Sequence, residues 1–133
     1  LGMPLPKGTV RVYKRDHTGA QQFIGEDMID HTPRDETLRI KMGDAFDVVG
    51  DRRQMDYTVV SSCVSESTWR VDLRNHKDED VAVTLMEPVG GDWEMVSSTH
   101  DWERVDAFTF TLTPDVASRG ETRVEYRVRV RWC

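Results

Sequence analysis

The sequence lacks the long hydrophobic run that a membrane-spanning helix requires. Its apolar residues occur in runs of only a few, whereas a helix needs about 20 apolar residues to cross a bilayer. The opening residues, LGMP, also lack the charged and apolar regions of a secretory signal peptide. We therefore expect no direct membrane insertion, and we interpret a chain that opens on Leu1 as a fragment of a longer protein.

Cysteine is scarce, with only Cys63 and Cys133. Two cysteines are too few for a disulfide framework, and their spacing matches no zinc-ligand motif. We expect a buried thiol at Cys63 and a free terminal thiol at Cys133. An internal or intermolecular disulfide is the alternative if the compartment is oxidising, and the sequence leaves this open.

The chain has fewer positively charged than negatively charged side chains. The chain has 18 Lys and Arg against 24 Asp and Glu, which gives a net charge of −6 and a pI near 5.2. Binding to nucleic acid depends on an excess of positive charge that displaces counterions from the phosphates. The charge therefore disfavours a nucleic-acid partner.

The motifs of common catalytic and metal sites are also missing. No HExxH, GxSxG or glycine-rich phosphate loop occurs, and no stretch has the ligand pattern of a calcium-binding EF-hand. The histidines are far apart and lie beside turn-like residues: His17, His31, His76 and His100. We expect no catalytic residues, no metal site and no cofactor, and therefore not an enzyme.

Helical periodicity is hard to find, but alternation of polar and apolar residues is frequent. The stretch VEYRVRVRW, residues 124–132, places Arg at 127, 129 and 131 between Val, Tyr and Trp. This pattern predicts a strand with one buried and one solvated face. The arginines should then lie beside a strand that offers carboxylates or hydroxyls, or on a charged edge. An anion-binding ladder and a protein-docking face are the alternatives.

Similar alternation recurs in about nine segments separated by Gly, Pro, Asn and Asp. Gly43-Asp44 and Gly50-Asp51 are expected to bound a short strand at 45–49, and a separate strand is expected at 57–64. Many short strands at this spacing are typical of an antiparallel sandwich. We predict an all-β fold, an antiparallel immunoglobulin-like β-sandwich of about nine strands, with residues 1–133 forming a single domain.

The four tryptophans are the main candidates for a ligand site. Trp69 and Trp132 alternate with apolar neighbours and are expected in the core. Trp93 and Trp102 lie near turns, where exposed rings could bind a sugar or a partner's apolar patch. We take Trp93 and Trp102 as the candidate ligand-binding residues, with burial in the core as the alternative.

Six segments carry a resemblance to a known family: LPKGTVRVYKRD, FIGEDMIDHTP, LRIKMGDAFDVVGDRRQMDY, LRNHKDEDVAVTLMEP, GDWEMVSSTH and YRVRVRW. Over residues 5–132 the chain resembles the C-terminal region of a bacterial domain-of-unknown-function family, the mucoidy inhibitor A-like proteins. The resemblance implies a parent with a further N-terminal part, a periplasmic or cell-envelope location, and no known catalytic residues. The terminal Cys133 departs from the family.

Together these observations predict a non-catalytic structural or protein-interaction domain of a bacterial envelope-associated protein. Its partner would be another protein or the N-terminal part of the parent, recruited by strand addition at a sheet edge. The alternative is a carbohydrate-binding module that uses Trp93 and Trp102.

Overall fold

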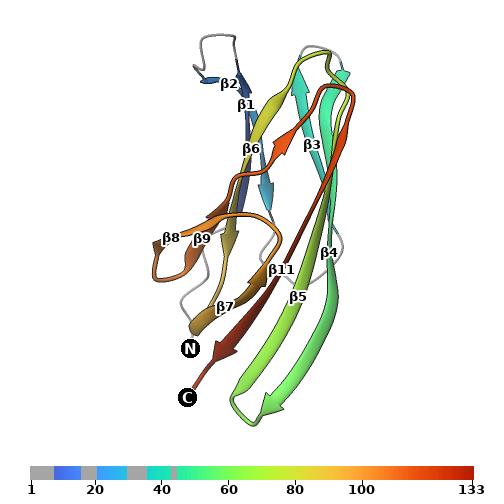
Figure 1. The fold of residues 1–133 in the computed structure, drawn as a ribbon. Helices are drawn as coiled ribbons and strands as arrows, with labels where there is room; N and C mark the ends of the chain where they lie inside the picture. The colour runs from blue at the N-terminus through green and yellow to red at the C-terminus, as the bar shows by residue number, and fades with distance from the viewer. Residues whose placement is uncertain (1–7, 16–20, 30–35, 43–44) are drawn as a thin grey trace.

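The fold consists of two antiparallel sheets packed face to face (Figure 1). The computed structural model describes residues 8–15, 21–29, 36–42 and 45–133. The strands are β1 (Gly8–Arg15), β2 (Gln21–Ile29), β3 (Glu36–Met42), β4 (Ala45–Ser61), β5 (Val64–Asn75), β6 (Val81–Pro88), β7 (Asp92–Ser98), β8 (Trp102–Asp106), β9 (Thr109–Leu112), β10 (Asp115–Val116) and β11 (Glu121–Arg131). The predicted all-β antiparallel sandwich is confirmed. The described residues contain no helix that could span a membrane.

The two sheets differ in length. One has the order β2-β1-β6-β9-β8, with β10 also pairing with β6, and the other has the order β3-β4-β5-β11-β7. In the second sheet β4, β5 and β11 have 17, 12 and 11 residues, whereas β6 and β9 of the first have 8 and 4. Figure 1 shows the β4–β5 hairpin extending beyond the end of the shorter sheet. We call these the short sheet and the long sheet.

The expected break at Gly50-Asp51 is wrong, because β4 runs without interruption from Ala45 to Ser61. Gly50 pairs with Leu38 of β3 on one side and with Leu73 of β5 on the other. Pairing on both sides holds a central strand in place despite the conformational freedom of glycine. Two further short strands, β8 and β10, were not expected from the sequence.

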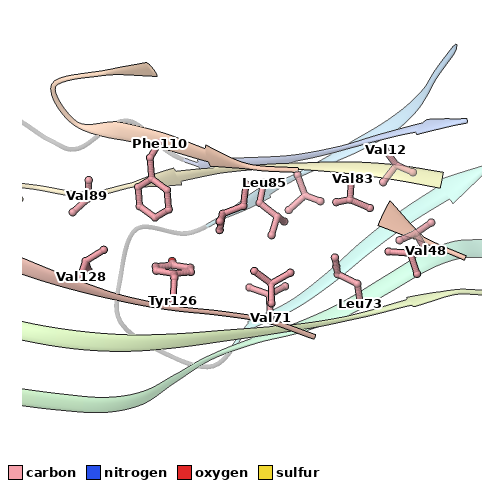
Figure 2. Close-up of a cluster of buried hydrophobic side chains, with 14 of the residues drawn as sticks. Val12, Val48, Val71, Leu73, Val83, Leu85, Val89, Phe110, Tyr126 and Val128 are labelled. Atoms are coloured by element: carbon pink, nitrogen blue, oxygen red, sulfur yellow. The ribbon is translucent and has the colours of Figure 1, made fainter. Parts of the chain in front are cut away.

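The core lies between the inner faces of the two sheets, where side chains from both layers point toward one another (Figure 2). The rings of Phe110 and Tyr126 meet edge to face, with centroids 5.1 Å apart and planes at 82°. The short sheet supplies Val12, Val83, Leu85 and Phe110, and the long sheet supplies Val48, Val71, Leu73 and Tyr126. Continuous burial on both inner faces accounts for the period-two pattern of the sequence.

The alternation in β11 is confirmed, because Val124, Tyr126, Val128 and Val130 are buried on the inner face. The arginines between them lie on the outer face and pair with carboxylates of neighbouring strands. Arg127 Nε donates to Glu66 Oε1 at 2.7 Å, and Arg129 Nε donates to Glu66 Oε2 at 2.7 Å. Arg127 Nη1 also contacts Asp56 Oδ2 at 2.8 Å. β11 lies between β5 and β7, so the ladder occupies the middle of a sheet and not an edge.

Acidification should weaken this outer-face network. Hydrogen bonds from Arg127 and then Arg129 lower the pKa of Glu66 below its ordinary value of 4.5. A lowered carboxyl pKa stabilises the fold above pH 4.5, and this stabilisation is lost as the pH falls through the folded value. We predict that Glu66→Gln lowers the Tm at neutral pH. On acidification the Tm of this variant should fall less than the Tm of the unsubstituted chain.

Thermal melts from neutral pH to below pH 4.5 measure this difference. Glu103→Gln on β8, where the side chain is exposed, is the control and should melt like the unsubstituted chain at each pH. If the Tm of Glu66→Gln and the Tm of the unsubstituted chain fell equally with pH, the role assigned to Glu66 would be contradicted.

A disulfide joins Cys63 to Cys133, so the expectation of two free thiols is wrong. Cys63 lies in the turn between β4 and β5, and Cys133 follows the end of β11. The backbone N–H of Trp132 donates to the carbonyl oxygen of Cys63 at 2.8 Å, which brings the two cysteines close together. The tip of the long hairpin is thereby fixed to the end of the neighbouring strand.

Removal of this disulfide should lower stability. The cysteines are 70 residues apart in the chain, and a cross-link over such a loop restricts the unfolded state. We predict that Cys63→Ser with Cys133→Ser lowers the free energy of unfolding by about 2–4 kcal/mol in urea titrations. Detection of free thiols in the oxidised protein would contradict the disulfide. A urea unfolding midpoint that dithiothreitol leaves unchanged would also contradict it.

Candidate functional site

A cavity opens between the two sheets, at the end where the long sheet extends beyond the short one. Its volume is about 530 Å³, within the usual range for small-molecule sites. The lining residues come from both sheets and from the chain end: Arg52, Gln54, Tyr57, Ser65, Ser67, Trp69, Pro88, Val89, Gly90, Phe110, Tyr126, Val128, Val130 and Trp132. The walls are mainly aromatic and aliphatic, with a few polar side chains among them.

The floor of the cavity follows directly from the strand register of the long sheet. Residues directly opposite one another on neighbouring strands share a face. The row nearest the core contains Gln54, Trp69 and Tyr126, and the next contains Tyr57, Ser67 and Val128. The last row contains Val59, Ser65 and Val130. The inner face of the sandwich therefore continues past the point where β6 and β9 end.

An ion pair between Arg52 of β4 and Glu87 of β6 lies at the deep end of the cavity. Both side chains are buried, and Arg52 Nη2 and Nε lie 2.9 Å and 3.2 Å from Glu87 Oε2. Arg52 Cζ also lies 4.0 Å above the centroid of the Trp69 ring, a cation–π geometry. The pair joins the two sheets beside the cavity.

Tyr126 completes the deep end. Burial raises the pKa of its phenol well above the ordinary value, and the negative charge of Glu87 raises it further. The phenol therefore stays protonated at neutral pH and can donate a hydrogen bond to Glu87. The protonated phenol and the ion pair form a connected structural unit.

The loop between β6 and β7 forms one wall of the cavity. Gly91 has a φ of 70°, and a Cβ there would lie 2.9 Å from both the carbonyl oxygen of Arg131 and Cγ1 of Val130. Only glycine fits this approach without a shift of the backbone. The close packing places Val89 and Gly90 against β11 beside the cavity.

The mouth of the cavity is aromatic and exposed. Trp132 is 65% exposed and Tyr57 59% exposed, and the exposed Val59 and Val60 lie beside Tyr57 on β4. The expectation that Trp132 lies in the core is wrong, because none of the described strands of the short sheet covers its ring. Trp69 is half-buried and lines the deeper part of the cavity.

Trp93 and Trp102 lie elsewhere and are not an exposed pair. Trp93 is only 3% exposed, because it pairs with Val130 on the inner face, and its Nε1 donates to the carbonyl oxygen of Ala107 at 3.1 Å. The expectation of an exposed ring at Trp93 is therefore wrong. Trp102 is 38% exposed and packs on Trp93, with centroids 5.8 Å apart.

The described histidines form no catalytic or metal cluster. His17 and His31 lie outside the described residues, and His76 is exposed in the turn after β5. His100 Nδ1 lies 2.8 Å from the hydroxyl of Thr99. The same hydroxyl accepts a hydrogen bond from the backbone N–H of Glu125. These contacts stabilise the β7–β8 turn. No group of three or more His, Cys, Asp or Glu converges within the described part of the chain.

Sequence reasoning missed the residues that define the cavity, although part of the signal was present. Arg52 follows Val48 and Gly50 at alternate positions, which places it on the inner face. Glu87 likewise follows Val83 and Leu85 on the inner face of β6. Two opposite charges at inward positions of different strands indicate a buried ion pair.

Comparisons with known proteins found no match: no protein-family model, no curated protein and no solved structure matches the chain. The resemblance to mucoidy inhibitor A-like proteins, and the location and partners that it implies, therefore stay predictions. Any account of function therefore depends on the geometry of the end of the sandwich that holds the cavity, which we call the open end.

Loss of one member of the ion pair should destabilise the fold strongly. Glu87→Ala leaves the Arg52 charge buried without its carboxylate, so we predict a loss of about 3–5 kcal/mol in the free energy of unfolding. The double variant Arg52→Met with Glu87→Leu removes both charges and replaces them with apolar side chains of similar volume. It should lower the free energy of unfolding much less than Glu87→Ala does. Urea titrations of the single and double variants compare the two, and equal losses would contradict the role of the pair.

Proposed function

We propose that this chain is a non-catalytic binding domain of a bacterial envelope-associated protein and that it engages its partner at the open end of the sandwich. The observation that carries this proposal is the part of the inner face, around Tyr57 and Val59 of β4, that the described strands of the short sheet leave exposed. Aromatic and aliphatic side chains there border a cavity of about 530 Å³. Exposed apolar surface next to a preformed recess is typical of a recognition site.

The chemistry of the open end favours binding over catalysis. Its buried charges neutralise one another, and the phenol of Tyr126 is held protonated. Catalysis of acyl transfer or hydrolysis needs a nucleophile beside a base, or a pair of carboxylates with separated pKa values. The lining residues contain neither arrangement.

Two observations support a location outside the cytoplasm. The first is the Cys63–Cys133 disulfide, since such bonds persist in oxidising compartments such as the bacterial periplasm. The second is the resemblance of the sequence to a family with exported members. The expected partner from the sequence is a protein or the N-terminal part of the parent, and exposed Val59 and Val60 at the hairpin tip favour such contact.

The open end can be tested by cosedimentation of the purified chain with the membrane and cell-wall fraction of the source organism. We predict that Trp132→Ala lowers the bound fraction several-fold, because the indole is a large exposed contact at the mouth of the cavity. Trp102→Ala is the matched control, since its ring is also partly exposed but is not among the residues that line the cavity. Equal binding of both variants, or no binding of the unsubstituted chain, would refute the proposal.

A further inference from the structure

The cavity at the open end favours one class of ligand over others. We propose that it binds an uncharged saccharide, with a sugar ring against Trp132 and Tyr57 and with sugar hydroxyls bonded to Gln54, Ser65 and Ser67. This inference rests on the proposed function and specifies the ligand of the same site. Charge, polarity, backbone pairing and the placement of the aromatic rings each support it.

The charge balance of the cavity favours an uncharged ligand. Among the described lining residues Arg52 alone is charged, and its guanidinium is bound by the Glu87 carboxylate. A carboxylate or phosphate of a ligand would therefore have to compete with Glu87 for Arg52. A buried charge without a partner is costly, so a charged group would not be stable at the deep end.

The polarity of the floor disfavours a purely aliphatic ligand. Ser65, Ser67 and Gln54 lie between the apolar rows, and Gln54 Nε2 donates to Ser67 Oγ at 3.3 Å. The Gln54 amide has a carbonyl oxygen and a second N–H besides this bond. An alkyl chain would displace water from these groups and return no hydrogen bond, whereas sugar hydroxyls can both donate and accept.

The backbone of the floor disfavours an extended peptide. A peptide that adds to a sheet needs a strand edge with unpaired N–H and C=O groups. Across all three rows β5 pairs with β4 on one side and with β11 on the other. β5 and β11 thus offer side chains to a ligand but no backbone edge, and the unpaired edge in these rows is the outer side of β4 beyond Arg52, at the rim of the floor.

The aromatic rings at the mouth are positioned to stack against a sugar. The electron-rich face of an indole or phenol attracts the weakly positive C–H groups of a saccharide ring. The backbone of Trp132 is fixed by its hydrogen bond to Cys63 and by the adjacent disulfide. A fixed backbone at Trp132 reduces the conformational entropy that this residue loses on binding, which favours affinity.

Two-dimensional NMR titration of the isotope-labelled chain tests the ligand class. The probes are neutral trisaccharides with different linkages (maltotriose, cellotriose and chitotriose), a glycan array that contains other neutral glycans, trigalacturonate as a charged saccharide, and palmitate as an aliphatic ligand. We expect at least one neutral saccharide to shift the amide signals of Ser65, Ser67, Val128 and Val130.

Matched variants then assign the contacts. Trp132→Ala and Tyr57→Ala should each weaken saccharide binding at least about tenfold, whereas Trp102→Ala should stay within about twofold of the unsubstituted chain. Gln54→Leu should weaken binding without loss of the aromatic contacts. Because all three rings are partly exposed, well-dispersed spectra of the variants serve as the check on folding.

The outcomes separate this inference from the proposed function. Binding of palmitate or trigalacturonate in place of every neutral saccharide would overturn the ligand class, as would the absence of any neutral glycan from the bound set. If cosedimentation with the envelope fraction still depends on Trp132 in that case, the binding domain stands and its ligand is not a neutral saccharide. If no neutral saccharide binds and cosedimentation does not depend on Trp132, both proposals are overturned.

Discussion

The ion pair between Arg52 and Glu87 joins the two sheets inside the core of this sandwich and borders its cavity. The inner faces of both sheets are apolar and packed together (Figure 2). Beyond the pair the core continues along β11 with Val128 and Val130, whereas the cavity opens over β4 and β5. Burial of two charges is costly, but here the guanidinium also lies over the Trp69 ring and Tyr126 can donate to the carboxylate. The pair thus joins the sheets without requiring a further apolar layer.

The unequal lengths of the sheets produce the functional surface. Among the described residues the end of the β4–β5 hairpin has no counterpart in the short sheet (Figure 1), and Tyr57 and Val59 on its inner face are exposed. A long hairpin with one uncovered face would be expected to be mobile, but the Cys63–Cys133 disulfide fixes its tip to the end of β11. On the outer face, Arg127 and Arg129 share the Glu66 carboxylate, and Asp56 and Glu94 also pair with them, so these cations are neutralised within the sheet. Recognition is therefore assigned to the recess between the sheets.

The sequence predicts the architecture well because side-chain alternation directly reflects which face of a strand is buried. The alternation around Val128 in β11 and around Val83 in β6 predicts strands that the structure contains. Gly50 was misread because a local turn signal carries no information on pairing by two neighbouring strands. The disulfide was missed for a similar reason, since only the fold brings Cys63 and Cys133 together.

The candidate site was harder to predict because it depends on the relative lengths of the two sheets. Trp132 continues the apolar alternation of β11, but its exposure follows from the absence of a covering strand. Trp93 lies near a turn in the sequence, yet it faces inward opposite Val130. Local patterns predict the face on which a side chain lies. They do not predict what covers that face.

Chemical accessibility of the inner face tests the central claim most directly. Ser67→Cys and Val71→Cys place a thiol on the same face of the same strand, one in the cavity floor and one in the core. The rate of modification by N-ethylmaleimide, measured by mass spectrometry under native conditions, compares them. The account predicts rapid modification of the thiol at position 67 and protection of the thiol at position 71. Equal protection of both thiols would show that the open end is filled, and would contradict the account.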